Sequence, residues 1–288
     1  MYNKFLERLL DNKPENVLSK HSIRIRKIIS PLLRFIAPFV TPNSKLKVLR
    51  RANIPNQPVI FAATHGFRED AEHTIIMTKR QAYVLNGSIS QVLNSFDGIT
   101  AWLAGMILVD RTDKTSRASS KDKMVYALKL GTSIIMYPEG TWNKSPNELI
   151  SGLFPGIYDV AKESGALVVP IATYRNGNKA YGIMGEAFNI STYDRDIGIT
   201  MLRDKMATMQ YEMIEQYGQC KRSDYGKEAD KYWKEYIDNL MAEAEFYEYE
   251  LERYTKYRPK GITSPQEAFA FMEKLEPNKR NAFLFRRE

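Results

Sequence analysis

The stretch VIFAAT at Val59–Thr64, followed directly by His65 and Gly66, decides the fold class. A compact apolar run of this length is typical of a strand that is buried within a sheet. The next segment, FREDAEHTIIMTKR at 67–80, has the composition of a helix. A buried strand followed by a helix is the unit from which layered α/β proteins with parallel sheets are built.

The same alternation of short apolar runs and helical segments continues along the middle of the chain. We expect further strands at 106–109, 133–137 and 167–173, and further helices at 121–130 and 155–164. The sequence therefore predicts an α/β fold with a mostly parallel central sheet flanked by helices, N-terminal amphipathic helices and a C-terminal helical extension.

The 288 residues are enough for one substantial core with helical additions. We assign residues 1–50 to a basic amphipathic membrane-associating segment, 51–203 to the α/β domain and 204–288 to the C-terminal helical extension. The extension is rich in Glu, Lys, Tyr and Met from about Thr200 onward. A last helix is expected to begin at Ser264, where the sequence has a capping box.

The N-terminal segment has apolar residues at helical spacing from Ile25 onward, and basic residues lie among them. Two interpretations are open: the helix packs its apolar face on the catalytic domain, or it lies in the interface of an anionic membrane. Its most apolar part, 28–40, is interrupted by Pro31, Arg34 and Pro38 and is too short to cross a bilayer.

The net charge of +8 indicates an acidic partner, which can be an anionic membrane, a phosphorylated substrate or nucleic acid. We expect no nucleic acid, because the aromatic and basic segment 221–257 is also dense in acidic residues. The single Cys220 excludes an internal disulfide and a cysteine-based zinc site, and no metal is expected. Residues 1–12 lack the features of a secretory signal, so we expect a cytoplasmic protein, peripheral on the inner face of the cell membrane.

His65 is the histidine best placed for catalysis, because it follows a strand at the sheet edge where open α/β sheets bind ligands. Asp70 lies five positions later in the predicted helix, and Gly66 permits a sharp turn between them. Asp70 can then fold back onto one imidazole nitrogen and leave the other to take a proton from an alcohol. On spacing alone, a chance His and Asp around a turn is the competing interpretation.

Four blocks in this part of the chain resemble those of the glycerolipid acyltransferase superfamily, which includes 1-acylglycerol-3-phosphate acyltransferase. His65–Asp70 is similar to its H-x-x-x-x-D motif, and GMILVDR at 105–111 is similar to its second block. YPEGT at 137–141 and VVPI at 168–171 are similar to the third and fourth. The blocks occur in the family's order and with family-like spacing.

The resemblance implies an O-acyltransferase of phospholipid biosynthesis in which His65 and Asp70 form the catalytic pair. It would transfer a fatty acyl group from acyl-CoA or acyl carrier protein to a hydroxyl of a lysophospholipid such as 1-acylglycerol-3-phosphate. No cofactor is needed besides this thioester co-substrate. The substrate-binding residues that follow from the blocks and their surroundings are Arg111, Glu139, Gly140, Thr141 and Lys144.

Each substrate-binding residue has a physical reason behind it. Arg111 offers a planar fork that suits a phosphate, although it can equally be a surface cation paired with Asp110 or Asp113. Glu139 can accept hydrogen bonds from acceptor hydroxyls, while Gly140 lets the backbone approach the substrate closely.

Two departures from the family pattern bear on the acceptor. Trp142, Asn143 and Lys144 stand where the family commonly has Arg and Ser, and Phe154-Pro155-Gly156 replaces Phe-Lys-x-Gly. Lys144 is a point charge and not a bidentate fork, and Trp142 can stack on a sugar or line an acyl groove. A glycolipid or another non-phosphate acceptor is therefore an alternative, and a non-catalytic basic membrane-surface protein is a second one.

Overall fold

The computed structural model describes residues 9–40, 45–67, 69–87, 102–111, 113–143 and 148–218. Lys144, Cys220 and the expected last helix at Ser264 lie outside the described residues.

Seven strands form one sheet in the described part of the chain, in the order β1-β7-β6-β2-β5-β3-β4. All neighbouring strands are parallel except β6 and β7, which form an antiparallel hairpin. The predicted mostly parallel sheet flanked by helices is confirmed. The strands are β1 (Lys45–Arg51), β2 (Val59–Ala63), β3 (Ala82–Asn86), β4 (Met106–Leu108), β5 (Ser133–Met136), β6 (Leu167–Asn176) and β7 (Lys179–Met184).

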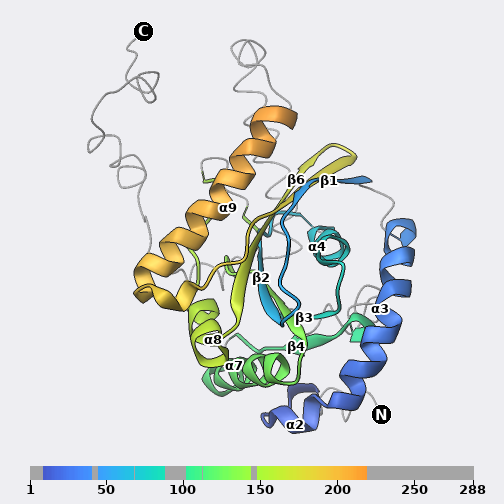
Figure 1. Ribbon diagram of the computed structural model, residues 1–288, viewed down its shortest axis with the longest axis vertical. Helices are drawn as coiled ribbons and strands as arrows, with labels where there is room; N and C mark the ends of the chain where they lie inside the picture. Colours follow the sequence, from blue (N-terminus) through green and yellow to red (C-terminus); the bar gives the residue numbers. More distant parts are fainter. Residues whose placement is uncertain are drawn as a thin grey trace. The chain divides into compact units, whose positions relative to one another are not determined.

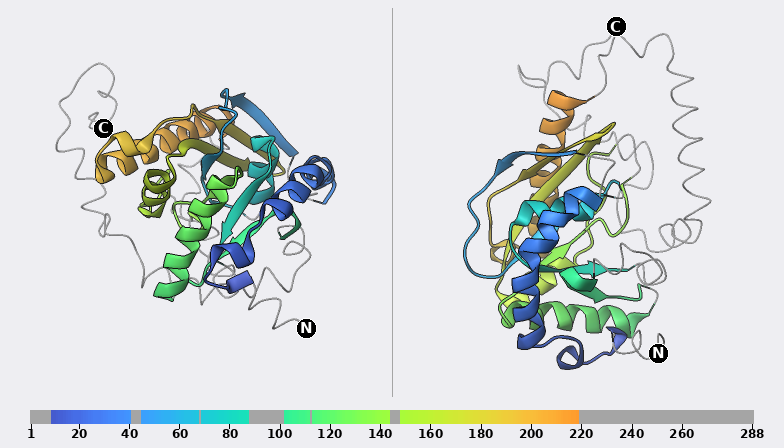
Figure 2. Two further views of the ribbon diagram at one scale, coloured as in Figure 1. Left: turned by 60° about the horizontal axis from the view of Figure 1, so that its bottom comes forward. Right: turned by 90° about the vertical axis from the view of Figure 1, so that its right-hand side faces the viewer.

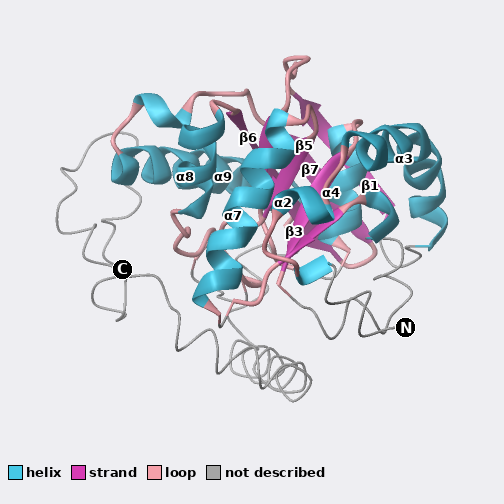
Figure 3. Ribbon diagram, turned by 90° about the horizontal axis from the view of Figure 1, so that it is seen from below, coloured by secondary structure: helices cyan, strands magenta, loops and turns pink. Residues whose placement is uncertain are grey.

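Helices cover both faces of this sheet (Figures 1 and 2). On one side lie α7, α8 and α9, and on the other lie α4 and α3, so that the strands run between two helical layers (Figure 3). The helical elements are α2 (Pro14–Val17), α3 (Lys20–Val40), α4 (Asp70–Thr78), α7 (Lys114–Lys129), α8 (Gly156–Ser164), the 3-10 helix η1 (Ile190–Thr192) and α9 (Arg195–Tyr217).

The side chains of β2 show why this strand is the centre of the fold. Every residue of β2 is fully buried, and successive side chains point to opposite faces of the sheet. Phe61 and its neighbours at alternate positions join a core with Met77 of α4. Ile60 and Ala62 join the larger core beneath α7, α8 and α9. This double burial explains the unbroken apolar run in the sequence.

Three elements start at places that differ from the sequence-based expectation. β1 begins at Lys45, inside the range assigned to the N-terminal segment; as an edge strand with alternating exposure it carries little apolar signal. α7 begins seven residues earlier than expected, because Asp113 caps it by accepting the N–H groups of Thr115 and Ser116. α9 begins at Arg195 and crosses the expected boundary at residue 203.

α3 places its large apolar side chains on the surface. Its inner side packs against the domain through the buried Ile23 and through Arg26, which donates a hydrogen bond to the carbonyl of Trp102. No helix in the described ranges is both long and apolar enough to span a membrane. The exposed apolar residues of α3, which we call the α3 stripe, are Ile25, Ile28, Leu32, Phe35, Ile36 and Phe39.

The central core sets the first prediction. Ile134 of β5 is completely buried, so Ile134→Ala should lower the free energy of unfolding by about 2–5 kcal/mol through lost burial and a cavity. Ile197 of α9 is 54% exposed, and Ile197→Ala should change stability by no more than about 0.5 kcal/mol. Chemical denaturation of both variants measures the difference; equal losses would contradict the described packing.

Candidate active site

His65 stands at the carboxyl edge of the sheet, two residues after β2 ends. β2 lies between β5 and β6, so the chain that follows each of these strands reaches the same edge. The segment after β5 brings Glu139 there, and the end of β6 brings Thr173. This is the edge at which open α/β sheets bind ligands.

The structure brings His65 and Asp70 into direct contact. Nδ1 of His65 lies 3.0 Å from each carboxylate oxygen of Asp70. Asp70 is fully buried at the start of α4, and its Oδ2 also accepts the backbone N–H groups of Gly66 (2.7 Å) and Phe67 (3.1 Å). These bonds satisfy the buried carboxylate and fold the turn around it.

This contact has a clear chemical meaning. With a proton on Nδ1, the carboxylate fixes the tautomer of His65 and leaves Nε2 as a base. The His65 side chain is 22% exposed, whereas that of Asp70 is not exposed at all, so only the imidazole can meet a substrate. In the described ranges, no three His, Cys, Asp or Glu side chains gather as a metal site.

Two aromatic rings and one backbone bond hold the imidazole in place. The ring centroid of Tyr137 lies 4.4 Å from that of His65, and Trp142 meets the imidazole edge-on at 5.8 Å. The N–H of Asn143 donates to the carbonyl of His65 at 2.6 Å. Burial, and then the charge of Asp70, raise the pKa of Tyr137 well above its ordinary value, so its hydroxyl is neutral at physiological pH.

Glu139 has a different place from the one we expected, which was to accept hydrogen bonds from acceptor hydroxyls. It is 1% exposed, and its two oxygens accept the backbone N–H groups of His65 (3.2 Å) and Ser151 (2.8 Å). Burial raises its pKa to about 7, although these two hydrogen bonds oppose the shift. Glu139 therefore links the turn after β2 to the loop before α8.

Gly140 and Thr141 form the turn after Glu139. Gly140 has a φ of +73°, which only glycine adopts without strain, and the ring of Phe154 fills the space that a side chain would need. We expected its backbone to approach the substrate, and in the structure the close neighbour is Phe154. Thr141 is half-buried beside Trp142, next to the imidazole.

Arg111 lies at the same edge of the sheet but farther along it. It follows β4, and its guanidinium covers Gly87 at the end of β3. Three strand spacings separate β4 from β2, which is about 14 Å. Asp113, one of the two carboxylates considered as its partner, caps α7. The guanidinium of Arg111 and the imidazole of His65 therefore lie in two separate regions of the same sheet edge.

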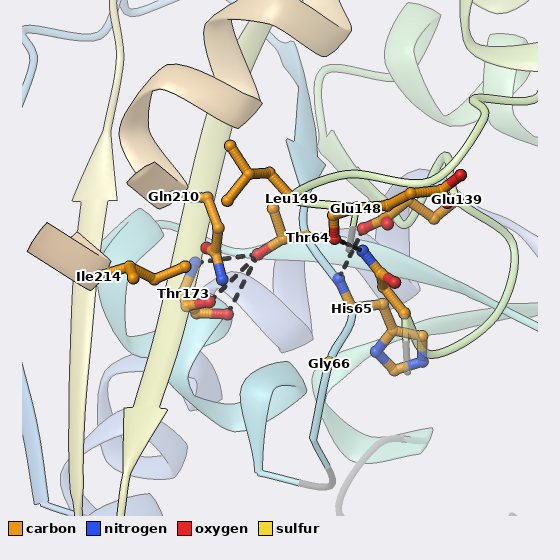
Figure 4. A pocket seen from close by; sticks show the side chains of 10 residues that line it. Thr64, His65, Gly66, Glu139, Glu148, Leu149, Thr173, Gln210 and Ile214 are labelled. Carbon is orange, nitrogen blue, oxygen red and sulfur yellow. Dashed lines mark hydrogen bonds between the residues drawn. The ribbon is translucent and has the colours of Figure 1, made fainter. Parts of the chain in front are cut away.

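A pocket of about 190 Å³ opens beside His65 on the side of β6 and α9 (Figure 4). Sequence reasoning missed most of it, because α9 reaches the sheet edge only through the tertiary fold. Thr64 and Thr173, whose hydroxyl oxygens lie 3.3 Å apart, join the ends of β2 and β6 there. The lining residues are Thr64, His65, Gly66, Glu139, Asn143, Glu148, Leu149, Thr173, Gln210 and Ile214.

Comparisons with known proteins show what the chain is similar to. Residues 45–174 match the model of the Acyltransferase family. A 1-acyl-sn-glycerol-3-phosphate acyltransferase of Chlamydomonas reinhardtii is 25% identical over 139 residues, which are 48% of this chain and 41% of that protein. The chain therefore matches about two fifths of the length of this curated relative.

The fold also resembles a solved structure. It is similar to that of the 1-acyl-sn-glycerophosphate acyltransferase PlsC from Thermotoga maritima, with a TM-score of 0.52 and 14% identity. The similarity covers 76% of this chain and 90% of that protein. At this identity the likeness concerns the fold.

The raised pKa of Glu139 predicts a pH-dependent stability. Its carboxyl holds a proton more tightly when folded, so stability falls as pH rises from 4.5 to about 7, by about 3 kcal/mol. Glu139→Gln has no carboxyl to titrate. The free energy of unfolding of the wild type, minus that of the variant, should therefore decline over that pH range. Denaturation at several pH values measures the decline, and parallel curves would contradict the assignment.

Proposed function

We propose that this chain, whose residues 45–174 match the Acyltransferase family, is an O-acyltransferase of the glycerolipid type that uses His65, oriented by Asp70, as its general base. The observation that carries the proposal is the buried carboxylate, 3.0 Å from one nitrogen of a partly exposed imidazole. The proposed donor is acyl-CoA or acyl carrier protein, and no further cofactor takes part.

The reaction proceeds by direct transfer. Nε2 of His65 takes the proton of the acceptor hydroxyl as the oxygen attacks the thioester carbonyl. The tetrahedral intermediate then collapses, the C–S bond breaks, and His65 returns the proton to the departing thiolate. A new ester and a free thiol are formed, and the enzyme is regenerated. Asp70 stabilises the imidazolium while the proton is held.

The surrounding residues contribute by positioning. A general base supplies a factor of roughly 10² to 10⁴ in rate, and alignment of the reactants must supply much of the rest. Glu139 and Asn143 fix the backbone of His65 from both sides through its N–H and its carbonyl. Tyr137 and Trp142 restrict the rotation of the ring.

We propose a lysophospholipid such as 1-acylglycerol-3-phosphate as the acceptor, in phospholipid biosynthesis. The name of the algal relative and the location of Arg111 at the sheet edge support this acceptor. A glycolipid acceptor is the alternative, because the motif lacks one of the family's usual arginines. A panel of both acceptor types separates the two.

The α3 stripe supports a peripheral location on an anionic membrane, which we propose on the inner face of the cell membrane. Ile28, Phe35 and Phe39 are 72%, 69% and 75% exposed and lie on one helix. Exposed apolar residues that are scattered singly need no explanation, but a group of them marks an interaction surface. Basic residues such as Arg24 accompany them on the same helix. Apolar side chains can enter the acyl boundary while the cations meet lipid phosphates.

Removing the base tests the reaction. His65→Ala should lower the rate of acyl transfer to lysophospholipids by at least about 10²-fold, because no other group takes the hydroxyl proton. His21 on the exposed side of α3 supplies the control, and His21→Ala should transfer at the wild-type rate. Transfer of radiolabelled acyl groups in detergent, with circular dichroism to verify folding, measures both. Equal turnover in all three proteins would remove His65 as the base.

The membrane proposal is tested on the α3 stripe. The double change Phe35→Ser and Phe39→Ser removes two large apolar contacts and should weaken binding to vesicles containing phosphatidylglycerol by at least about tenfold. Ile197→Ser, an exposed apolar position on α9, is the control and should bind like the wild type. Co-sedimentation measures the binding. Unaltered binding of the double variant would rule out α3 as the anchor.

A further inference from the structure

A second cavity lies at the amino edge of the sheet, opposite the edge that carries His65. It has a volume of about 280 Å³ and opens where β2, β3 and β5 begin, with α3 beside it. The five residues of β2, which span about 16 Å, separate Pro58 in its wall from the carboxyl edge. The cavity is therefore distinct from the proposed active site.

We propose that this amino-edge cavity binds one phosphate group, carried by a phospholipid headgroup or free in solution. Its volume is close to the lower limit of the usual range for small-molecule sites, which suits a ligand of headgroup size. The inference does not rest on the proposed acyl transfer. The side chains that would donate to the phosphate are Lys27 of α3, Asn56 before β2, Arg80 before β3 and Ser133 at the start of β5.

Two cations supply the charge that binds a phosphate. Nζ of Lys27 donates to the carbonyl of Gly131 at 2.9 Å, and Nη1 of Arg80 donates to the carbonyl of Gln57 at 3.1 Å. Each bond engages one donor, whereas an ammonium has three and a guanidinium has five. Within the described part of the chain, neither cation forms an ion pair. Both therefore keep donors and charge for an anionic ligand.

The surroundings of Arg80 favour an anion beside it. The residue is half-buried, and burial lowers the pKa of its guanidinium because the charged form loses hydration. A phosphate next to the guanidinium would replace the stabilisation that water no longer provides. The planar fork can also meet two phosphate oxygens at once.

Two neutral side chains add further donors to the wall. Oγ of Ser133 accepts the N–H of Val59 at 3.2 Å, which leaves its hydroxyl proton to donate. Asn56 is exposed, so its amide can turn its N–H groups toward a ligand. These two donors and the two cations come from four separate segments of the chain.

The origin of the donors favours a phosphate over a carboxylate. Donors from four segments meet the cavity from several sides, and a tetrahedral phosphate presents oxygens in several directions. A carboxylate has two oxygens in one plane and can satisfy fewer of these groups. We therefore expect the cavity to distinguish the two anions.

A purely structural interpretation accounts for only one of the cations. Lys27 faces the end of α7, where a cation stabilises the last carbonyls of a helix without any ligand. Arg80 has no such helix end to neutralise, because its bond goes to the loop before β2. Two cations from unrelated segments in the wall of one cavity are better explained by a shared anion.

The location of Lys27 indicates a source for the phosphate. The next residue, Ile28, belongs to the α3 stripe and is 72% exposed. The proposed contact of this stripe with the membrane would bring lipid headgroups next to the cavity. A bound headgroup would then connect α3 to the sheet through Lys27 and Arg80.

The first experiment measures phosphate binding by calorimetry at constant ionic strength, so that general screening does not contribute. The full chain should bind inorganic phosphate saturably, and Lys27→Gln and Arg80→Gln should each weaken the affinity at least about tenfold by removing a charged donor. Lys20→Gln, an exposed cation of the same helix, is the matched control and should bind like the wild type.

The outcome depends on the pattern across these proteins. Equal affinity in all four, or the absence of saturable binding, would overturn the inference. Lys27 is exposed, so Lys27→Gln tests the site even where Arg80→Gln fails to fold. Circular dichroism verifies the fold of each variant.

Arg111 at the carboxyl edge requires a separate control, because it can bind the same probe. Arg111→Gln should leave the binding that depends on Lys27 and Arg80 unchanged. If Arg111→Gln instead abolished all saturable binding, the phosphate would belong to the carboxyl edge and the amino-edge site would be refuted.

Two further probes identify the ligand. Acetate should bind at least about tenfold more weakly than phosphate, and equal affinity would contradict the assignment to phosphate. Monomeric dihexanoyl phosphatidylglycerol carries the phosphate of a lipid headgroup. Tighter binding of this lipid than of inorganic phosphate, lost in Arg80→Gln, would support a headgroup site. The opposite order with the same loss would support a site for free phosphate, whereas binding that ignores both variants would refute the site.

Discussion

The buried carboxylate of Asp70 is the interaction on which the site depends. One oxygen of this side chain contacts the imidazole of His65 and accepts the N–H groups of Gly66 and Phe67, so the same group that orients the proposed base also folds its turn. A loss of Asp70 would therefore disturb geometry and chemistry together. Buried charges of this kind persist in proteins because their hydrogen bonds replace water completely.

A second buried carboxylate, that of Glu139, holds the same turn. Glu139 accepts the N–H of His65 at one oxygen and that of Ser151 at the other, and it does so from the turn that follows the neighbouring strand β5. The two acids have separate tasks. Asp70 orients the imidazole, while Glu139 fixes the backbone that carries it.

The central part of this arrangement could be predicted from the sequence. The apolar run of β2 indicated a buried strand, and the position of His65 after it, with Gly66 and Asp70 following, indicated the dyad. β1, β3 and β7 were not among the expected strands. β1 alternates in exposure and gives no continuous apolar signal, whereas β3 and β7 are mostly buried but each has only a short apolar run. The role of Glu139 was also missed, since a motif shows which residue types are present but not which backbone groups they meet.

The part contributed by α9 was beyond prediction for a different reason. Gln210 reaches the pocket only because a long helix packs along β6, and no local pattern in the sequence encodes that approach. By contrast, the pairing of His65 with Asp70 is local and follows from one turn. Prediction therefore succeeded where the chemistry lies within a few residues and failed where it depends on distant segments.

The long-range bonds around His65 have a consequence for folding. Thr64 bonds to Thr173 across 109 positions, and His65 bonds to Glu139 across 74. Contacts between segments so far apart form late and slowly, because the chain must first close large loops. The strands that carry these residues must be joined before the base is held. A folding intermediate can therefore possess the His65–Asp70 turn and still be inactive, so catalytic competence should be among the last properties that a refolding chain recovers.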